Sequence, residues 1–482
     1  MKTLKHESIK AGHRKIAFML LCLFAFMSLG AGCTKGLDSE TQEASKRVTM
    51  NIWAVIDDID TYQTVLSDYQ KLHPNVQLNY RRLRLEEYEK ELINALAEDR
   101  GPDVFLIHND WGGEYMPKIL PMPASTKVAY RVVTGTIKKV STYQLQTEPT
   151  ITLKTYKEQF ADAVTQDTIR QVNVSPKPDS TDLQPRVIGL PVSIDTLALY
   201  YNKDLLNAAG IPNPPEHWGQ FQEQVEKLTK LDAQGNIAQA GAAIGTGRNV
   251  ERSTDILSVL MIQNGAEMTS DRGDITLHAI PPALQDRLDQ PPATQALQFY
   301  TDFANPSTKN YTWNLDQPDS LDAFIHGRTA FFFGYSYHLQ QIRAGNPKLN
   351  LGISKLPQIE GNPVKNYANY WYWVVSKKTK NPDTAWNFLQ YLIKPETSKK
   401  LLDVTKRPAA RKSQLSAQLN DEDVGVFASQ VLTATSWYRG KDSETMEEAF
   451  QTMIDDVVTG KNNLRDAIKF AVEKIAQTMS GL

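Results

Sequence analysis

The chain has 482 residues, with 53 basic and 55 acidic side chains and a formal net charge of −2. Its first 32 residues carry five Lys or Arg and one Glu, so the rest of the chain holds 48 basic and 54 acidic residues, a net charge of −6. This mildly acidic balance argues against nucleic acid and anionic lipid as partners. The length allows a large core divided over two or three lobes.

The N-terminal residues have the layout of a secretory signal peptide. A basic stretch precedes an apolar run over residues 16–27, which is too short to span a bilayer as a mature helix. Small residues then precede Cys33, an order that resembles the lipobox of bacterial lipoproteins, although Leu29 lies four residues before the cysteine where that family usually has it three before. We predict a signal peptide over residues 1–32 and a lipidated Cys33; an ordinary cleaved signal peptide and an uncleaved anchor are the alternatives.

The cysteines and the residues after Cys33 indicate where the chain works. Cys22 lies in the apolar run, so removal of the signal peptide leaves a single cysteine and no disulfide, and stability must come from the core. Residues 33–47 are small and polar and predict a flexible spacer. We therefore expect an extracytoplasmic protein, lipid-anchored to the outer face of a bacterial cell membrane.

The spacer is followed by an alternation of strands and helices. We predict strands over 48–54 and 76–80, a continuously apolar buried strand over 103–107, and helices over 60–72 and 86–97. This order at this spacing implies right-handed crossovers and a parallel sheet, and hence an α/β lobe.

Three later segments interrupt the alternation. Residues 125–156 are rich in Val, Thr and Tyr and predict a β-hairpin, with strand patterns over 137–143 and 151–156. Residues 176–185 and 272–292 predict a polar loop and an irregular surface loop.

The rest of the chain is mainly helical. We predict helices over 202–209, 218–231, 253–264, 293–304, 320–326 and 382–393, and an almost wholly helical segment from Val424 to the C-terminus.

Signatures of catalysis and of cofactor binding are missing from the sequence. None of the eight histidines is paired at ligand spacing with another His or with Cys, so a zinc site has no support. The sequence contains neither a phosphate-binding loop nor a Gly-x-Ser-x-Gly nucleophile motif. Asp57, Asp58 and Asp60 are not followed by the residues that complete a calcium loop. We predict no cofactor, no metal and no enzymatic activity.

Aromatic residues stand next to polar groups in several predicted loops, one of which directly follows the buried strand over 103–107. Trp111 comes directly after Asn109 and Asp110, and similar placements hold for Tyr335, Tyr337, Trp371 and Trp437. Ligands of open α/β sheets bind at the carboxyl ends of the strands. Sugars suit such places because their C–H faces stack on rings and their hydroxyls need hydrogen-bond partners. The alternative is that these rings are simply core residues.

Longer motifs carry a resemblance to a known family. The run 189–206, GLPVSIDTLALYYNKDLL, resembles the core signature of family 1 extracellular solute-binding proteins, the maltose-binding-protein-like receptors of sugar ABC importers. Segments 209–218, 327–331, 373–377 and 381–389 resemble further elements of the same family. The likeness extends from about Val48 to the C-terminus, and 125–156 and 272–292 depart from it.

The resemblance implies a two-lobe, periplasmic-binding-protein-like fold with a multi-segment hinge that closes on the ligand. We expect lobe 1 to comprise 48–192 with about 370–424, and lobe 2 to comprise 196–357 with about 425–482.

The resemblance also implies ligand contacts. Asp195 takes the position of an acidic ligand-binding residue, and the other expected contacts are Asp57, Asp58, Asn109, Asp110, Trp111, Tyr335, Tyr337, Trp371 and Trp437. Carboxylates would accept sugar hydroxyl protons and rings would supply an apolar platform. The implied function is a monomeric binding lipoprotein that captures a mono- or oligosaccharide and delivers it to an ABC permease. The alternatives are a surface-anchored polysaccharide-active enzyme with paired carboxylates and a receptor for a peptide, polyol or other non-sugar solute.

Overall fold

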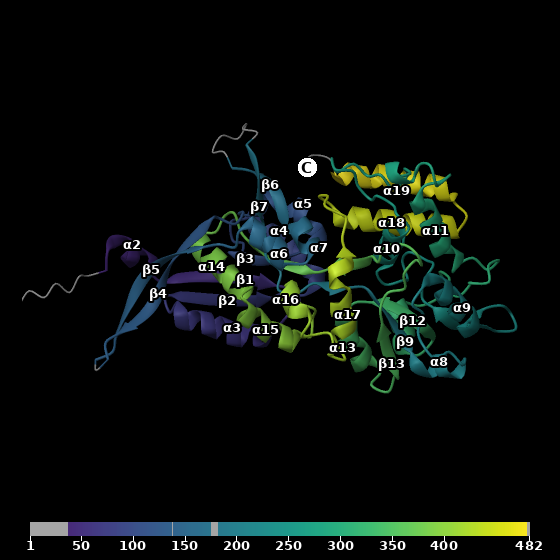
Figure 1. Cartoon of the computed structure of the whole chain (residues 1–482), viewed down its shortest axis with the longest axis horizontal. Coiled ribbons are helices and arrows are strands. Elements are labelled where there is room, and N and C mark those ends of the chain that lie inside the picture. Colours follow the sequence, from purple (N-terminus) through teal and green to yellow (C-terminus); the bar gives the residue numbers. More distant parts are fainter. Residues whose placement is uncertain (1–36, 137, 175–181, 480–482) are drawn as a thin grey trace, which may run out of the picture. The chain divides into compact units, whose positions relative to one another are not determined.

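A computed structural model describes residues 37–136, 138–174 and 182–479 (Figure 1). The predicted signal peptide, Cys33 and the start of the spacer lie outside these residues. The described chain divides into two compact units, one formed by 37–47 with 128–146 and the other by 48–127 with the residues from 147 onward.

The first unit combines a short helix with the outer part of a hairpin. Helix α2 (Ser39–Ala44) begins after Asp38, whose side chain accepts a hydrogen bond from the Thr41 N–H at 2.8 Å. The spacer prediction is therefore wrong over these residues, because this N-cap supports a helical turn. Strands β4 (Ser125–Thr134) and β5 (Val140–Pro149) form the predicted hairpin.

The predicted strand over 151–156 is wrong. Helix α6 (Leu153–Gln159) begins there, since the Thr152 hydroxyl accepts a hydrogen bond from the Thr155 N–H at 3.2 Å and caps the helix. It is followed by α7 (Asp162–Thr168) and a second hairpin, β6 (Ile169–Asn173) with β7 (Leu183–Val187). Residues 176–181 of the predicted polar loop lie outside the described residues, and the loop's last three residues belong to β7.

The second unit contains the parallel sheet predicted for the start of the chain. Its order is β15-β3-β1-β2, where β1 (Val48–Ala54), β2 (Val76–Arg82) and β3 (Val104–His108) are parallel and α3 (Ile59–Leu72) and α4 (Leu85–Ala97) connect them. The apolar periodicity of α3 places its tyrosines, Val65 and Leu66 in the core. Strand β15 (Trp371–Val375) returns from far along the chain and pairs antiparallel with β3.

A second, mixed sheet has the order β10-β11-β12-β9-β13. Its central strand β12 (Thr329–Gly334) is buried throughout and lies between β9 (Ala198–Asn202) and β11 (Ile237–Ala242). The outer strands are β10 (Lys230–Leu231) and β13 (Leu351–Ser354). Because β10 pairs with β11, helix α9 (Trp218–Leu228) ends three residues before its predicted end.

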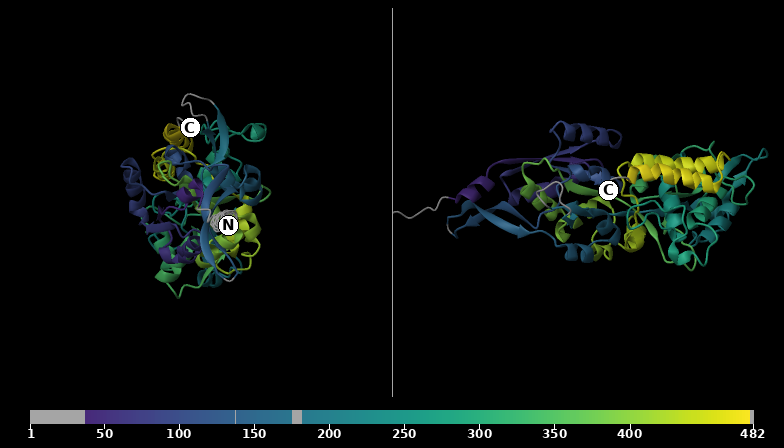
Figure 2. Two further views of the ribbon diagram at one scale, coloured as in Figure 1. Left: turned by 90° about the vertical axis from the view of Figure 1, so that its left-hand side faces the viewer. Right: turned by 90° about the horizontal axis from the view of Figure 1, so that it is seen from above.

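The remaining helices agree with the predicted ones to within two residues where a prediction exists. They are α5 (Gly112–Tyr115), α8 (Lys203–Ala208), α10 (Ser253–Gln263), α11 (Pro292–Asp302), α12 (Ser320–Ile325), α13 (Ser336–Gly345), α14 (Pro382–Leu392), α15 (Pro395–Thr405), α16 (Lys412–Leu415), α17 (Gly425–Gln430), α18 (Ser443–Val458) and α19 (Leu464–Met479). Figure 2 shows α18 and α19 packed side by side at the C-terminal end of the chain. Residues 272–291 are irregular apart from an isolated β-bridge at Ile275 and one short 3-10 turn over Pro282–Leu284, and residue 292 begins α11.

Two large apolar cores lie around the two sheets, and the chain passes between them at a small third sheet. One core ends at Ile194 and the other begins at Leu197, on either side of β8 (Asp195–Thr196). The same change occurs at β14 (Asn366–Asn369) and at β16 (Ala434–Thr435). The sheet β16-β14-β8 is thus the place where three chain segments cross from core to core.

Candidate ligand-binding site

The carboxyl end of β3 is held firmly against the start of β15. Asn109 exchanges two hydrogen bonds with the backbone of Tyr370, one from its own N–H to the Tyr370 carbonyl at 3.0 Å and one to its Oδ1 from the Tyr370 N–H at 3.1 Å. The Asn109 amide donates to the Asp110 carboxylate at 2.9 Å. Burial acts to lower the pKa of His108, but its contact with Asp110 outweighs burial and raises that pKa.

The same strand end carries a group of stacked rings, which we call the aromatic cluster: Trp111, Trp371, Tyr88, Tyr115 and His108. Trp111 stacks on Tyr115 with centroids 5.7 Å apart and meets Trp371 edge-on at 5.1 Å. Trp371 lies opposite His108 in the β15–β3 register. Both tryptophans are half-buried, packed against the core on one side and accessible on the other. The fold thus brings together two tryptophans that are 260 residues apart in the sequence.

A charged group at the start of α10, which we call the Arg252 network, lies close enough to this strand end for Arg252 to act on the pKa of His108. The Arg252 guanidinium donates two hydrogen bonds to Asp255 at 2.8 and 3.1 Å and lies 3.5 Å from Glu447. The Tyr335 hydroxyl donates to Asp255 at 2.7 Å. Arg252 has a backbone φ of 55°, a left-handed conformation that costs a non-glycine residue of order 1–3 kcal/mol. Such strain concentrates at functional positions.

The charges of the two groups act on one another. Burial raises the pKa of Glu447; Arg252 opposes this, Asp255 and Asp110 add to it, and His108 opposes it. Glu447 nevertheless keeps 35% of its side chain exposed. Residues of β3 and of α10 and α18 therefore share one electrostatic environment.

Asp195 lies on β8, where the chain crosses between the cores. It is 6% exposed, and its carboxylate accepts hydrogen bonds from the Ser336 N–H at 2.9 Å, the Ser336 hydroxyl at 2.6 Å and the Thr196 N–H at 2.9 Å. Burial raises the pKa of Asp195 to about 6, although these donors act to lower it. Asp195 therefore joins the crossing sheet to the start of α13.

The two aspartates after β1 behave differently. Asp57 forms a two-bonded ion pair with Arg407 at 2.8 and 2.9 Å, and both side chains are largely buried. Burial acts to lower the pKa of Arg407, but its contact with Asp57 and, to a lesser extent, the charge of Asp195 raise that pKa. Asp58 is 64% exposed and pairs with Arg82, so it points away from this group.

The predicted aromatic residues near the second core also differ in exposure: one is partly exposed and two are buried. Tyr337 is 36% exposed, and burial raises its pKa, while Arg252 opposes the rise and the charges of Glu251, Asp255 and Asp195 add to it. Tyr335 is fully buried and stacks behind Tyr337 with centroids 5.8 Å apart. Trp437 is 3% exposed, belongs to the second core and donates its indole N–H to Ser258. The sequence predicts Trp437 as a ligand contact. In the structure its ring is instead enclosed by core side chains.

Sequence reasoning missed the charged partners of the site. Arg252, Asp255, Glu447, Arg407 and His108 were not predicted, because an isolated charged residue in a sequence has the pattern of an ordinary surface side chain. The i, i+3 spacing of Arg252 and Asp255 at a helix start was the available signal.

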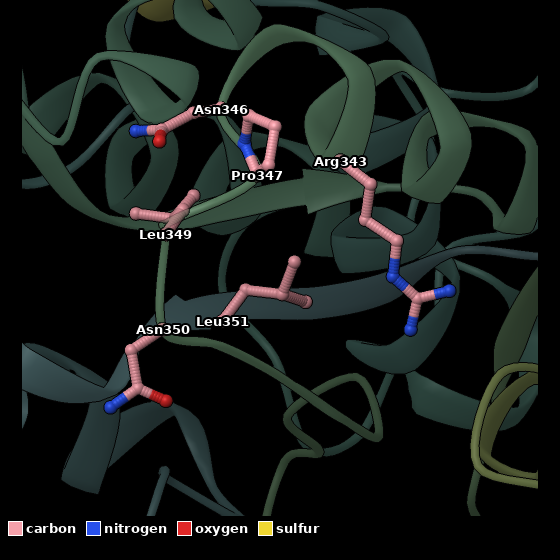
Figure 3. Close-up of a pocket in the computed structure, with 6 residues that line it drawn as sticks. All are labelled: Arg343, Asn346, Pro347, Leu349, Asn350 and Leu351. Carbon is pink, nitrogen blue, oxygen red and sulfur yellow. The ribbon is translucent and has the colours of Figure 1, made fainter.

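A separate hollow of about 420 Å³ lies at the end of α13 and the start of β13 (Figure 3). It is lined by Arg343, Asn346, Pro347, Leu349, Asn350 and Leu351, none of which was predicted as a ligand contact. Arg343 is already paired with Asp423 at 2.7 Å. Within the described ranges, no group of three His, Cys, Asp or Glu side chains is placed to hold a metal ion. Over the same part of the chain, every helix is too short or too polar to cross a membrane.

The comparisons with known proteins agree with this fold. A profile of the bacterial extracellular solute-binding protein family matches residues 54–399, and the chain belongs to this family. A maltodextrin-binding protein of Bacillus subtilis is 24% identical over 307 residues, which cover 61% of this chain and 67% of that protein. A protein of Brucella abortus named as a binding protein is 24% identical over 254 residues, which cover 51% of this chain and 56% of its own length. The chain thus spans little more than half of that relative.

A solved structure of a cyclo/maltodextrin-binding protein complexed with maltotetraose is similar over 91% of this chain and 98% of the other, with a TM-score of 0.67 and 16% identity. The predicted α/β fold of two lobes, of the periplasmic-binding-protein kind, is confirmed by this likeness.

Proposed function

We propose that this chain is the sugar receptor of an ABC importer, which captures a mono- or oligosaccharide between its two lobes and delivers it to a membrane permease without chemical change. The observation that carries the proposal is the pair of half-buried tryptophans of the aromatic cluster at the end of β3, whose His108 is acted on by Arg252. Rings offer an apolar platform for a sugar face, and buried charged groups pair with its hydroxyls.

Further support comes from the relatives. The B. subtilis relative is named for maltodextrin, and the similar structure was solved with maltotetraose. These ligands belong to those proteins, and for this chain they define the class of solute to test first.

The lobes we assign to this receptor are 48–192 with about 370–424, and 196–357 with about 425–482. The two apolar cores support this division, and the three crossing strands β8, β14 and β16 would form the hinge. Residues 428, 431 and 434 pack with the first core, so the last crossing is better placed near β16 than near Val424.

Within this proposal the ligand contacts are Asp110, Trp111 and Trp371 from one lobe and Tyr337 with Arg252 from the other. Asp195 and Asp57 would act at the hinge, where Ser336 and Arg407 already hold them. Asn109 would hold the loop through Tyr370.

The function is tested by measuring the melting temperature of the purified chain with a panel of oligosaccharides, polyols, amino acids and peptides. A ligand that binds only the folded state of the receptor raises the receptor's Tm. We expect maltodextrin-class sugars to raise Tm. We also expect no new reducing ends to appear when the protein is incubated with these sugars. New reducing ends would identify the polysaccharide-active alternative, and a shift by another solute class alone would identify a non-sugar receptor.

The proposed address is tested separately. We propose that Cys33 is lipidated and holds a monomeric receptor on the outer face of the bacterial membrane. Changing Cys33→Ala should abolish labelling by a fatty-acid analogue and membrane attachment, whereas Cys22→Ala, in the same N-terminal segment, should leave both intact. Attachment that survives Cys33→Ala after signal cleavage would contradict the assignment.

A further inference from the structure

The hairpin of β4 and β5 differs in charge from the rest of the chain (Figure 1). Its outer part, residues 128–146, contains Arg131, Lys138 and Lys139 and no acidic residue, whereas the chain after residue 32 has a net charge of −6. All three basic residues are exposed, and the two lysines lie at the tip, between the strands. The overall acidic balance, which argues against an anionic partner, therefore does not describe this segment.

The tip also exposes aliphatic side chains. Val133, the last residue but one of β4, and Val140, the first residue of β5, are 51% and 52% exposed. The two strands form a sheet of their own, and a two-stranded hairpin is only marginally stable by itself in water. Exposed aliphatic side chains next to basic ones are the combination that the headgroup region of an anionic bilayer accommodates.

The start of the described chain brings this unit close to the proposed lipid anchor. Residues 37–47, which contain α2, belong to the same compact unit as 128–146. Leu37 is four residues after Cys33, and an extended chain covers about 3.5 Å per residue, so the unit begins within about 14 Å of the cysteine. The placement of the unit beside a membrane rests on the proposed lipidation of Cys33.

The acidic residues around α2 do not cancel the charge of the hairpin. Asp38 is occupied as the cap of α2 through Thr41, and Glu43 pairs with Lys46. The described residues of the whole unit hold five basic and three acidic side chains, a net charge of +2. The unit thus stays cationic, and its outermost part carries no acid at all.

We propose that the tip of the β4–β5 hairpin binds the surface of an anionic phospholipid bilayer. Arg131, Lys138 and Lys139 lie near the lipid phosphates, and Val133 and Val140 reach the boundary with the acyl chains. The hairpin then adds a protein–lipid contact to the lipid anchor and limits the orientations that the receptor takes above the membrane.

The first test uses the mature chain from residue 33 with Cys33→Ala, which carries no lipid, so it depends neither on the anchor nor on the solute. Co-sedimentation is measured with vesicles of phosphatidylglycerol and phosphatidylcholine, and with vesicles of phosphatidylcholine alone. We expect binding to the anionic vesicles that falls with added sodium chloride, and no binding to the neutral ones. Equal binding to both kinds of vesicle, or binding to neither, overturns the proposal.

Charge-reversal variants assign the binding to the hairpin. A basic residue near an anionic surface strengthens binding about fivefold, so Lys138→Glu with Lys139→Glu should weaken it by at least about 25-fold. Lys348→Glu with Lys355→Glu is the matched control, since it makes the same charge change at exposed residues on either side of β13, and it should bind like the parent within about twofold. Tm of both variants verifies that they are folded. Parent-like vesicle binding by the hairpin variant overturns the proposal, and a loss of solute uptake in cells with that variant would then assign the hairpin to the permease.

A fluorescent label shows whether the tip itself meets the lipid. With Cys33→Ala the mature chain has no cysteine, so a polarity-sensitive dye can be placed at Val140→Cys alone. Val364→Cys is the matched control, because Val364 is also 52% exposed. We expect anionic vesicles to shift the emission of the label at 140 to shorter wavelength and to leave the label at 364 unchanged. Equal shifts at both positions, or a shift at 364 alone, would contradict the assignment.

Discussion

The aromatic residues at the ends of the strands in the two cores look alike in the sequence and differ in the fold. At the end of β3, Trp111 and Trp371 pack on Tyr88 and Tyr115 and keep an accessible side. In the second core, Tyr335 and Trp437 are enclosed. The Tyr335 hydroxyl donates a hydrogen bond to Asp255, and the Trp437 indole N–H donates one to Ser258.

The difference shows what makes a ring available to a ligand. In the first core, Tyr88 and Tyr115 already fill the space behind the tryptophans, so the tryptophans are held at the surface. In the second core, Tyr337 occupies the outer position and Tyr335 lies behind it. A buried aromatic with a satisfied polar atom stabilises the fold, whereas a half-buried one can also bind.

The largest expected effect is a loss of stability when the enclosed Trp437 is removed, and its absence would contradict the difference between the two cores. Trp437→Ala empties a core position, so it should lower the free energy of unfolding by about 3–5 kcal/mol. Thermal or urea unfolding of the ligand-free protein measures this. Phe470→Ala, an exposed aromatic on α19 at 52% accessibility, should change stability little. A stable Trp437→Ala protein with lost sugar binding would place Trp437 in the site after all.

Asp195 tests the link between the crossing sheet and the second lobe. Asp195→Ala should weaken sugar affinity by about 1.5–3 kcal/mol, or one to two decades in Kd, because it removes a charged acceptor. Calorimetric titration with the solute found by the panel measures the change. Ser336→Ala separates the two possible roles. If Ser336→Ala reproduces the loss, Asp195 acts by positioning α13; if it does not, Asp195 contacts the ligand.

Trp111 tests the accessible side of the aromatic cluster. Trp111→Ala should weaken sugar affinity by about 1.5 kcal/mol through lost stacking. Stability should fall by less than in Trp437→Ala, because the ring is only half-buried. Trp111→Phe should recover part of the affinity. A loss of Tm as large as that of Trp437→Ala, with affinity unchanged, would make Trp111 a core residue.

The smallest effect concerns pH. Burial, and next the charge of Glu89, raise the pKa of Glu114, beside the aromatic cluster, to about 7, while Lys118 opposes the shift. A carboxyl group whose pKa is raised on folding stabilises the fold below its ordinary pKa and loses that contribution as pH rises through 7. Glu114→Gln should therefore raise Tm at pH 8 relative to the parent chain and change it little at pH 5. Glu86→Gln, exposed on α4, serves as control, and the same Tm difference at both pH values would contradict the assignment.

The periodicity of the apolar residues determined the three parallel strands of the first sheet, whereas the antiparallel pairing of β15 with β3 was not predicted. Strands β1 and β3 and helices α3 and α4 lie within one or two residues of their predicted bounds, because each element must bury one side or both sides in the same core. The motif around residues 189–206 was long enough to identify the family and the two-lobe fold. The prediction over 151–156 failed because a local cap at Thr152 outweighed the β-propensity of the residues around it.

Within the candidate site, the sequence alone pointed to the loop of Asn109, Asp110 and Trp111, because polar and aromatic residues follow a buried strand there. Only the tertiary structure decided which rings stay accessible and which charges are paired. Trp371 reaches Trp111 through strand pairing between segments far apart in the chain, and Arg252 and Arg407 gain their partners through packing. Burial and ion pairing depend on the distance between side chains that one-dimensional spacing does not contain, so these features follow from the folded chain alone.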